Sequence, residues 1–370
     1  MEVESFDLTS FLGVKLHCTL IKNQLERKII LPSLLDEFEL KGLKLKNRIV
    51  MPPMCQYSVK AKDGIPNDWH FTHYTSRAVG GAGLIIMEMT DVEPAGRISD
   101  YDLGLWSDEQ IPAFKRIIES CQSYGAKVGI QIAHAGRKAE DAEVPVSSSA
   151  IQFSDQYKKP RELSTEEVEE MVKKFEAAFE RAVKAGVDTI EIHGAHGYLI
   201  HQFQSPLTNK RTDKYGEDKA LFGVEIIQAA RRVMPESMPL IMRISAVEYA
   251  EDGYGVDYAI ELAKRYNEAG VDIIHVSSGG ESNSGPSNSG PGYQLNLAKE
   301  MKEALHIPTI AVGRMEDPKL CEEAIREGKA DLVAVGRGML RNPYWANEAS
   351  IVLGGKPLTP EPVAAAYSIR

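Results

Sequence analysis

Eight short, continuous apolar runs recur along the chain and are separated by longer amphipathic segments. The runs are Arg48–Met51, Leu84–Met89, Val128–Ile132, Thr189–His193, Leu240–Ile244, Ile273–Val276, Thr309–Val312 and Leu332–Val335. Runs without alternation between apolar and polar residues are typical of parallel strands that are buried on both faces. Because strands and helices alternate throughout, we predict an α/β fold with a single (β/α)8 TIM barrel rather than two doubly wound domains.

Helix signals fill the segments between these runs. Ser164 stands three residues before Glu167 in a capping-box pattern, and Gly186 ends the apolar periodicity, so we predict a helix over Glu166–Ala185. The periodicity also predicts a helix over Tyr258–Ala269. Since no linker interrupts the alternation after residue 30, we expect one barrel domain over residues 31–370.

Residues 1–30 stand apart from this pattern. The stretch Phe11–Ile21 is partly apolar but too short to span a membrane, and acidic residues precede it, unlike a secretory signal. Two interpretations stay open at this point. The segment is either a loosely ordered extension, or an ordered arm or helix that binds a partner.

The balance of charge argues against two classes of partner. Asp and Glu number 53 against 43 Lys and Arg, a net charge of -10, which disfavours general binding of nucleic acid or of an anionic membrane. The four cysteines, Cys18, Cys55, Cys121 and Cys321, are widely separated and form no C-x-x-C pair. We therefore expect a cytoplasmic protein with neither a disulfide framework nor a metal site.

Polar side chains follow several of the predicted strands, where a barrel places its reactive groups. His193, His196 and Tyr198 come at the end of the fourth run. Two histidines three residues apart can bind zinc, but these straddle a strand end and no H-E-x-x-H pattern is present. The favoured alternative is a pair of imidazole donors for one substrate oxygen, with a phenol beside them as a proton source. A purely structural role for the histidines is the third interpretation.

Arg243 lies inside the fifth apolar run, so we expect its guanidinium to be partly buried and to need a partner. That partner is either a carboxylate such as Glu191 or a ligand atom that gains negative charge. The dipeptides Gly313-Arg314 and Gly336-Arg337 end the last two runs, where barrels often bind phosphate. The sequence therefore predicts a phosphate-bearing ligand.

Two further features leave alternatives open. Cys55 follows the first run beside a pair of prolines, and it is either a nucleophile or a thiol that tunes a cofactor. Ser277–Gly292 (SSGGESNSGPSNSGPG) has low complexity and follows the sixth run. It is either a mobile linker or a rim loop of the site.

Six segments carry a likeness to a known family: Leu45–Met51, Pro53–Tyr57, Gly129–Lys138, Ile192–Ile200, Ser205–Arg211 and Val335–Arg337. On these segments the chain resembles the old yellow enzyme family of FMN-dependent oxidoreductases. It looks most like the bacterial, thermophilic-like branch of ene-reductases. The resemblance extends from about Leu31 to the C-terminus and implies a TIM barrel.

The resemblance also implies a role for each candidate residue. Flavin binding would fall to Pro52, Pro53, Met54, Cys55, Met89, Gln131, Arg243, Gly313, Arg314, Gly336 and Arg337. Within this set Cys55 would tune the flavin, Gln131 and Arg243 would bind its pyrimidine end, and the last four would hold its phosphate. His193, His196 and Tyr57 would contact the substrate, Tyr198 would deliver a proton, and Arg370 would reach a neighbouring subunit's active site. Met89 stands where the family usually has a small residue.

The activity implied is that of an NAD(P)H dehydrogenase that acts as an ene-reductase. NADPH or NADH would reduce FMN, and an α,β-unsaturated carbonyl or nitro compound would then accept hydride at its β-carbon in a ping-pong cycle. The family's common assemblies imply a homodimer or homotetramer. Two other interpretations remain: a flavin-free barrel aldolase or isomerase for a phosphorylated substrate, and a flavin-bound protein without turnover.

Overall fold

The computed structural model describes residues 31–367, and a compact unit begins at Ser33. The extension over residues 1–30 and the candidate residue Arg370 lie outside the described residues.

Eight parallel strands close into a barrel. Their bounds are Ile49–Met51 (β3), Leu84–Asp91 (β4), Lys127–Ala133 (β6), Thr189–Gly194 (β9), Leu240–Ser245 (β10), Ile273–Ser277 (β11), Thr309–Ala311 (β12) and Leu332–Ala334 (β13). Neighbouring strands pair in the order β3-β13-β12-β11-β10-β9-β6-β4, and pairing of β3 with β4 completes the circle. All eight predicted strands are therefore confirmed, with ends that shift by two residues at most.

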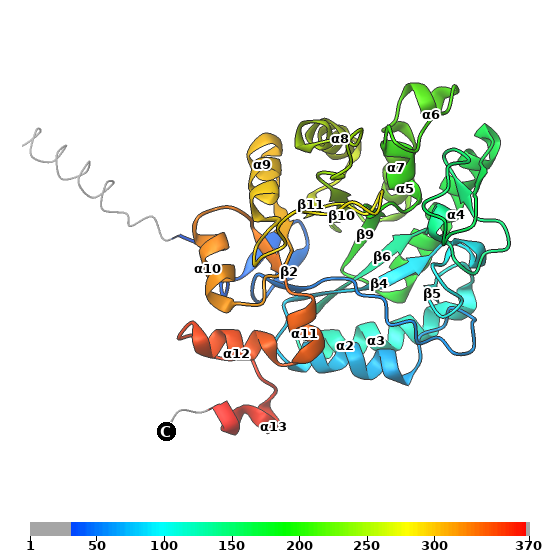
Figure 1. Cartoon of the computed structure of the whole chain (residues 1–370). Helices are drawn as coiled ribbons and strands as arrows, with labels where there is room; N and C mark the ends of the chain where they lie inside the picture. Colours follow the sequence, from blue (N-terminus) through cyan, green and yellow to red (C-terminus); the bar gives the residue numbers. More distant parts are fainter. Residues whose placement is uncertain (1–30, 368–370) are drawn as a thin grey trace, which may run out of the picture. The chain divides into compact units, whose positions relative to one another are not determined.

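Helices follow the strands and cover the outside of the barrel (Figure 1). The longer ones are Asp68–Val79 (α2), Ile111–Ser123 (α3), Thr165–Ala185 (α4), Leu221–Val233 (α7), Val256–Ala269 (α8), Leu295–Leu305 (α9), Pro318–Arg326 (α10) and Trp345–Val352 (α12). Short helices are Leu199–Gln204 (α5), Lys214–Glu217 (α6), Arg337–Arg341 (α11) and Glu361–Ala364 (α13). Short strands are Leu103–Gly104 (β5), Val146–Ser147 (β7) and Arg161–Glu162 (β8).

The helix predicted from the capping box forms as α4. The Ser164 side chain accepts a hydrogen bond from the Glu167 backbone N–H, and the Glu167 side chain returns to the Ser164 backbone. Gly186 ends the helix in the left-handed conformation at φ 92°, which glycine adopts without steric cost. Five apolar side chains of α4 face the barrel and fix the helix against it: Val168, Met171, Val172, Phe175 and Phe179.

An antiparallel hairpin, Phe38–Leu40 (β1) and Leu43–Leu45 (β2), packs against the inner residues of the strands. Leu43 and Leu45 are each 1% exposed and join an apolar cluster with Leu84, Ile241 and Ile310. These strand residues lie toward the amino-terminal ends of the strands. The polar chemistry is thus restricted to the carboxyl ends, because apolar side chains fill the opposite end.

Truncation of Leu43 tests this apolar floor. We expect Leu43→Ala to lower the free energy of unfolding by about 2–5 kcal/mol, since the removed atoms leave a cavity between hairpin and barrel. Chemical denaturation of the variant and the wild type measures the loss. Leu358→Ala is the control, because Leu358 is 44% exposed. Equal stability of the two variants would contradict a packing role for the hairpin.

Candidate active site

A cavity of about 300 Å3 opens at the carboxyl ends of the strands. Nine residues singled out in the sequence line it: Pro52, Pro53, Met54, His196, Arg243, Gly313, Arg314, Gly336 and Arg337. Two lining residues, Ser277 and Ser278, begin the predicted rim loop Ser277–Gly292, and the others were not predicted: Tyr293, Gln294, Val312, Met315 and Glu316. Ser277 ends β11, so the same strand-end criterion applied to polar residues would have found it.

Arg243 projects from β10 into this cavity and is 8% exposed. Its Nε is buried without a hydrogen-bond partner, and no hydrogen bond or ion pair joins its guanidinium to another described residue. The carboxylate of Glu191 is already engaged, since Gln131 Nε2 donates to one oxygen at 2.7 Å and His275 Nδ1 lies 2.7 Å from the other. Of the two partners expected for Arg243, this arrangement favours the ligand.

Three guanidinium groups and one carboxylate face the cavity. Arg314 Nη1 donates to the Ser289 carbonyl at 2.8 Å, and Arg337 Nε lies 3.8 Å from Glu316 Oε1. A surplus of cationic donors around an unpartnered, buried Arg243 fits an anionic, phosphate-bearing group such as FMN.

His193, His196 and Tyr198 lie together beside the cavity, as predicted. The rings of His193 and His196 are 5.1 Å apart, those of His193 and Tyr198 are 4.8 Å apart, and both pairs meet edge to face. His193 Nδ1 accepts from the Ala195 N–H at 3.2 Å, and His196 Nε2 lies 2.6 Å from Ser277 Oγ. Each ring thus uses one nitrogen to fix its orientation.

Burial sets the protonation of these side chains. It lowers the pKa of His193 and of His196 well below the usual range, and the Arg243 cation lowers both further. Burial raises the pKa of Tyr198 well above its usual value. At neutral pH the site therefore presents two neutral imidazoles and an intact phenol.

The turn that carries these residues adopts a demanding backbone conformation. His196 and Gly197 both have positive φ, 59° and 72°, and a Cβ on Gly197 would stand 2.2 Å from the Gly280 carbonyl oxygen. Several contacts hold the turn: Ser245 Oγ accepts from the His196 N–H at 3.0 Å, and His201 Nδ1 accepts from the Gly197 N–H at 2.8 Å. Local strain is maintained here by surrounding structure, as is common at functional sites.

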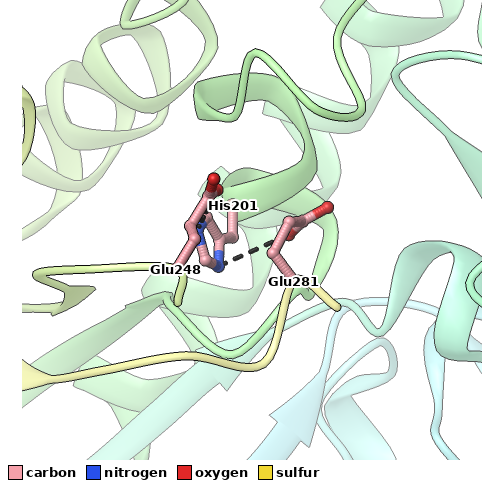
Figure 2. A group of neighbouring side chains, drawn as sticks. All are labelled: His201, Glu248 and Glu281. Carbon is pink, nitrogen blue, oxygen red and sulfur yellow. Dashed lines mark hydrogen bonds and ion pairs between the residues drawn. The ribbon is translucent and has the colours of Figure 1, made fainter. Parts of the chain in front are cut away.

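His201 belongs to a buried network with Glu248 and Glu281, drawn in Figure 2. His201 Nε2 lies 3.1 Å from Glu248 Oε1, and the opposite nitrogen, Nδ1, lies 3.5 Å from Glu281 Oε2. Nδ1 already accepts from Gly197, and Arg137 Nη2 forms an ion pair with Glu281 at 2.8 Å. The two carboxylates contact different nitrogens of the His201 ring, and the Arg137 cation lies beside one of them. This arrangement favours a hydrogen-bonded network that holds the turn at Gly197 over a metal site.

Arg137 and Lys138 end the short 3₁₀ helix Gly136–Lys138 after β6 and reach across the site. Lys138 Nζ donates to the His196 carbonyl at 2.9 Å and to the Gly280 carbonyl at 2.5 Å. Glu281 is buried and bound by Arg137, and Ser277 and Ser278 line the cavity, so the start of Ser277–Gly292 is fixed at the edge of the site. These contacts favour a rim loop over a mobile linker. Both residues lie in Gly129–Lys138, one of the segments that carry the family likeness, but the sequence gave no sign of these partners.

The other candidates lie outside the lining of the cavity. Met89 is 1% exposed and packs in an apolar cluster that Cys55 and Tyr198 also contact. Burial, followed by the carboxyl groups of Glu88, Asp102 and Asp91, raises the pKa of Cys55 well above its usual value. A thiol that stays protonated is a poor nucleophile, so the tuning interpretation is favoured. Tyr57 is 50% exposed and has φ 49°.

A β-bulge anchors the loop that carries Cys55 and Tyr57. The pairing of β4 with β6 shifts between Met87 and Met89, which leaves Glu88 as the extra residue. Glu88 Oε2 accepts from the Gln56 N–H at 2.7 Å, and Tyr74 Oη donates to Glu88 Oε1 at 2.8 Å. Burial raises the pKa of Glu88 to about 8 despite these hydrogen bonds.

Similar proteins confirm the family. The family model described as NADH:flavin oxidoreductase / NADH oxidase matches residues 33–352. A protein of Listeria monocytogenes serotype 4a named NADPH dehydrogenase is 48% identical over 324 residues, which are 87% of this chain and 95% of the relative. The chain belongs to the NADH:flavin oxidoreductase / NADH oxidase family. The predicted membership of the old yellow enzyme family is thereby confirmed, as are an oxidoreductase activity, FMN as cofactor and a nicotinamide donor.

Solved structures of this family agree with the barrel. The structure of morphinone reductase aligns with a TM-score of 0.76 at 26% identity and covers 91% of this chain and 94% of its own. A structure of 2-naphthoyl-CoA reductase aligns with a TM-score of 0.81 at 26% identity, and this chain spans about half of that longer one, 52%. Within residues 31–367, no helix is both long and apolar enough to cross a membrane.

Substitution of Glu88 tests the buried anchor of the loop. Because the folded state binds this proton more tightly than the unfolded chain does, the wild type should lose stability as pH rises from about 5 to 8. We expect Glu88→Gln to flatten that part of the curve, so that the Tm difference, variant minus wild type, increases toward alkaline pH. Thermal unfolding between pH 5 and 9 measures it, with the exposed Glu119→Gln as control. A difference independent of pH would contradict the assignment.

Proposed function

We propose that this chain is an NADPH-dependent ene-reductase that reduces activated alkenes, such as α,β-unsaturated carbonyl and nitro compounds, in a ping-pong cycle. The observation that carries the proposal is the pair of neutral imidazoles, His193 buried and His196 half-buried, with a protonated phenol beside a cation-lined cavity. The name NADPH dehydrogenase of the Listeria relative supports the choice of donor. Membership of a flavin-dependent family disfavours the aldolase or isomerase alternative.

The cavity residues would hold FMN. Gly313, Arg314, Gly336 and Arg337 would bind its phosphate, Arg243 would bind the polar end of its ring, and Pro52, Pro53 and Met54 would lie along it. Outside the lining, Gln131 would add to the contact at the polar end, and Cys55 and Met89 to the contact along the ring. Bound FMN supplies the hydride chemistry between the nicotinamide donor and the alkene. The unpartnered Arg243 would stabilise negative charge that arises on the ring, and this would give the buried guanidinium a partner.

The imidazoles would orient and polarise the substrate. Because His193 Nδ1 accepts from Ala195, its proton is on Nε2, which can donate to a carbonyl or nitro oxygen. His196 pairs through Nε2 with Ser277, and its Nδ1 would be the second donor when the Ser277 hydroxyl donates to Nε2. Two neutral donors stabilise oxygen charge without a proton transfer, and Tyr198 would protonate the α-carbon, with Tyr57 in contact with the substrate.

An anaerobic absorbance titration tests the function. NADPH is added first to FMN-loaded protein, and 2-cyclohexenone follows. We expect the flavin band to bleach with NADPH and to return with the enone. A protein that takes up no FMN would overturn the proposal as a whole. A band that bleaches and never returns would overturn the ene-reductase activity alone.

Removal of one imidazole donor tests the substrate site. We expect His193→Ala to slow reoxidation by 2-cyclohexenone about 10²–10³-fold, the usual loss for one such donor. Bleaching by NADPH should change much less, since that step lacks a developing carbonyl charge. Stopped-flow absorbance separates the two steps, and His306→Ala, at the exposed end of α9, is the control. An unchanged enone step would remove the histidines from the mechanism.

We also propose a homodimer or homotetramer. Four large apolar side chains on or beside α11 and α12 are exposed: Leu340, Tyr344, Ile351 and Val352 at 42%, 41%, 52% and 53%. Such a gathering of exposed apolar side chains near the C-terminus suits a contact with a second copy. If Arg370 completes a neighbour's site, as the family likeness implies, this contact would deliver it. Analytical ultracentrifugation of the full chain tests the assembly, and a monomer at micromolar concentration would overturn it.

A further inference from the structure

Lys138 links three parts of the candidate site through one ammonium group. It donates to the carbonyl of His196 at 2.9 Å and to the carbonyl of Gly280 at 2.5 Å. The same Nζ lies 5.6 Å from the centre of the Tyr198 ring and 4.0 Å from that of Phe153. The group therefore contacts the turn with the proton donor, the rim loop after β11 and the segment between β7 and β8.

The surroundings of Lys138 have opposing effects on the pKa of its ammonium group. Burial lowers its pKa to about 8, the neighbouring Arg137 lowers it as well, and Glu281 raises it. The other titratable groups that face it are His193, His196 and Tyr198 on the turn after β9. Both histidines are neutral, so two cations act on Tyr198: the Lys138 ammonium, which is in contact with the ring, and the buried Arg243 guanidinium.

We propose that Lys138 is a positioning residue for the proton-delivery step, where its ammonium holds the His196–Tyr198 turn and stabilises the charge left on Tyr198. This inference rests on the proposed ene-reductase function. In that step the phenolic O–H bond would break and a C–H bond would form at the α-carbon of the substrate, and bound FMN would supply the hydride for the β-carbon. The phenolate that remains regains a proton from water.

The physical need for a cation follows from burial. A phenolate in a buried site is costly, as the raised pKa of Tyr198 indicates. A cation over or beside an aromatic ring is attracted to it even when the ring is neutral, and the attraction grows once the ring carries negative charge. Two charge-assisted hydrogen bonds to carbonyl oxygens keep the ammonium in place, so that the cation does not have to be recruited during the reaction.

Replacement of Lys138 by a neutral or a permanently charged side chain tests the inference. The two half-reactions of FMN-loaded wild type, Lys138→Met and Lys138→Arg are followed by stopped-flow absorbance from pH 6 to 9, with NADPH and then 2-cyclohexenone. Lys158→Met is the matched control, because Lys158 also donates to a loop carbonyl, that of Ala142 at 2.7 Å, but on the exposed surface.

The expected results separate charge from simple support. The enone step of the wild type should slow as pH rises through about 8, where Lys138 loses its proton. In Lys138→Met that step should be roughly tenfold slower at pH 7 and should lack the inflection. In Lys138→Arg the cation persists, so the inflection should disappear while the rate at pH 7 stays within about threefold of the wild type. The NADPH step should change by less than twofold in both variants.

Contrary outcomes are distinct. An inflection near pH 8 that persists in Lys138→Arg would overturn the inference, even if Lys138→Met fails to fold. A Lys138→Met variant with wild-type rates would do the same. A wild type whose flavin is never reoxidised by the enone overturns the proposed function itself, and the inference falls with it.

A readout independent of turnover follows the lysine directly. Competitive acetylation with acetic anhydride, analysed by peptide mass spectrometry, reports the fraction of unprotonated amine at each pH. We expect Lys138 to label with a midpoint near pH 8, well below that of a model lysine peptide. A midpoint near 10.4, the usual lysine value, would contradict the inflection near pH 8 that we expect for the enone step of the wild type.

Discussion

Closure of the sheet is the constraint on which the site depends. Strand β3 pairs with β13 on one side, where Ile49 lies opposite Val333, and with β4 on the other, where Val50 lies opposite Leu84. Since parallel strands end at one edge, this closure brings the segment after β3 to the same mouth as the turns after β9, β12 and β13. Residues that are almost 300 positions apart in the sequence, such as Pro52 and Arg337, then line one cavity.

Inside the barrel, polarity is divided along the axis. The lower layer is apolar, with Leu84, Ile241 and Ile310 packed on the hairpin. One layer higher, Gln131, Glu191 and His275 join in a buried hydrogen-bonded group. That group uses both oxygens of Glu191 and leaves Arg243 without a protein partner. A buried cation is costly unless something pairs with it, and this favours an anionic ligand as the partner of Arg243.

Much of this could be predicted from the sequence, because strand ends are visible as changes in apolar periodicity. All eight strands were predicted, and the criterion of a strand end selected most of the cavity. The supporting contacts could not be predicted. Arg137 meets Glu281 across 144 positions, and Glu281 lies in a loop of Gly, Ser and Asn whose composition suggested mobility equally well. The bulge at Glu88 was hidden too, since the apolar run around it is continuous.

Burial also divides the site by its response to pH. His193 and His196 stay neutral throughout the physiological range, because burial and the Arg243 cation disfavour their charged forms. They can therefore serve as hydrogen-bond donors whose strength does not vary with pH. Burial lowers the pKa of Lys138 and Glu281 raises it, and the resulting pKa of about 8 lies close to neutral pH. Two groups around the site therefore change charge near pH 8: Lys138, which holds the His196–Tyr198 turn, and Glu88, which holds the loop of Cys55 and Tyr57. The two imidazoles stay constant, so a response to pH in this range would come through one of these two supports.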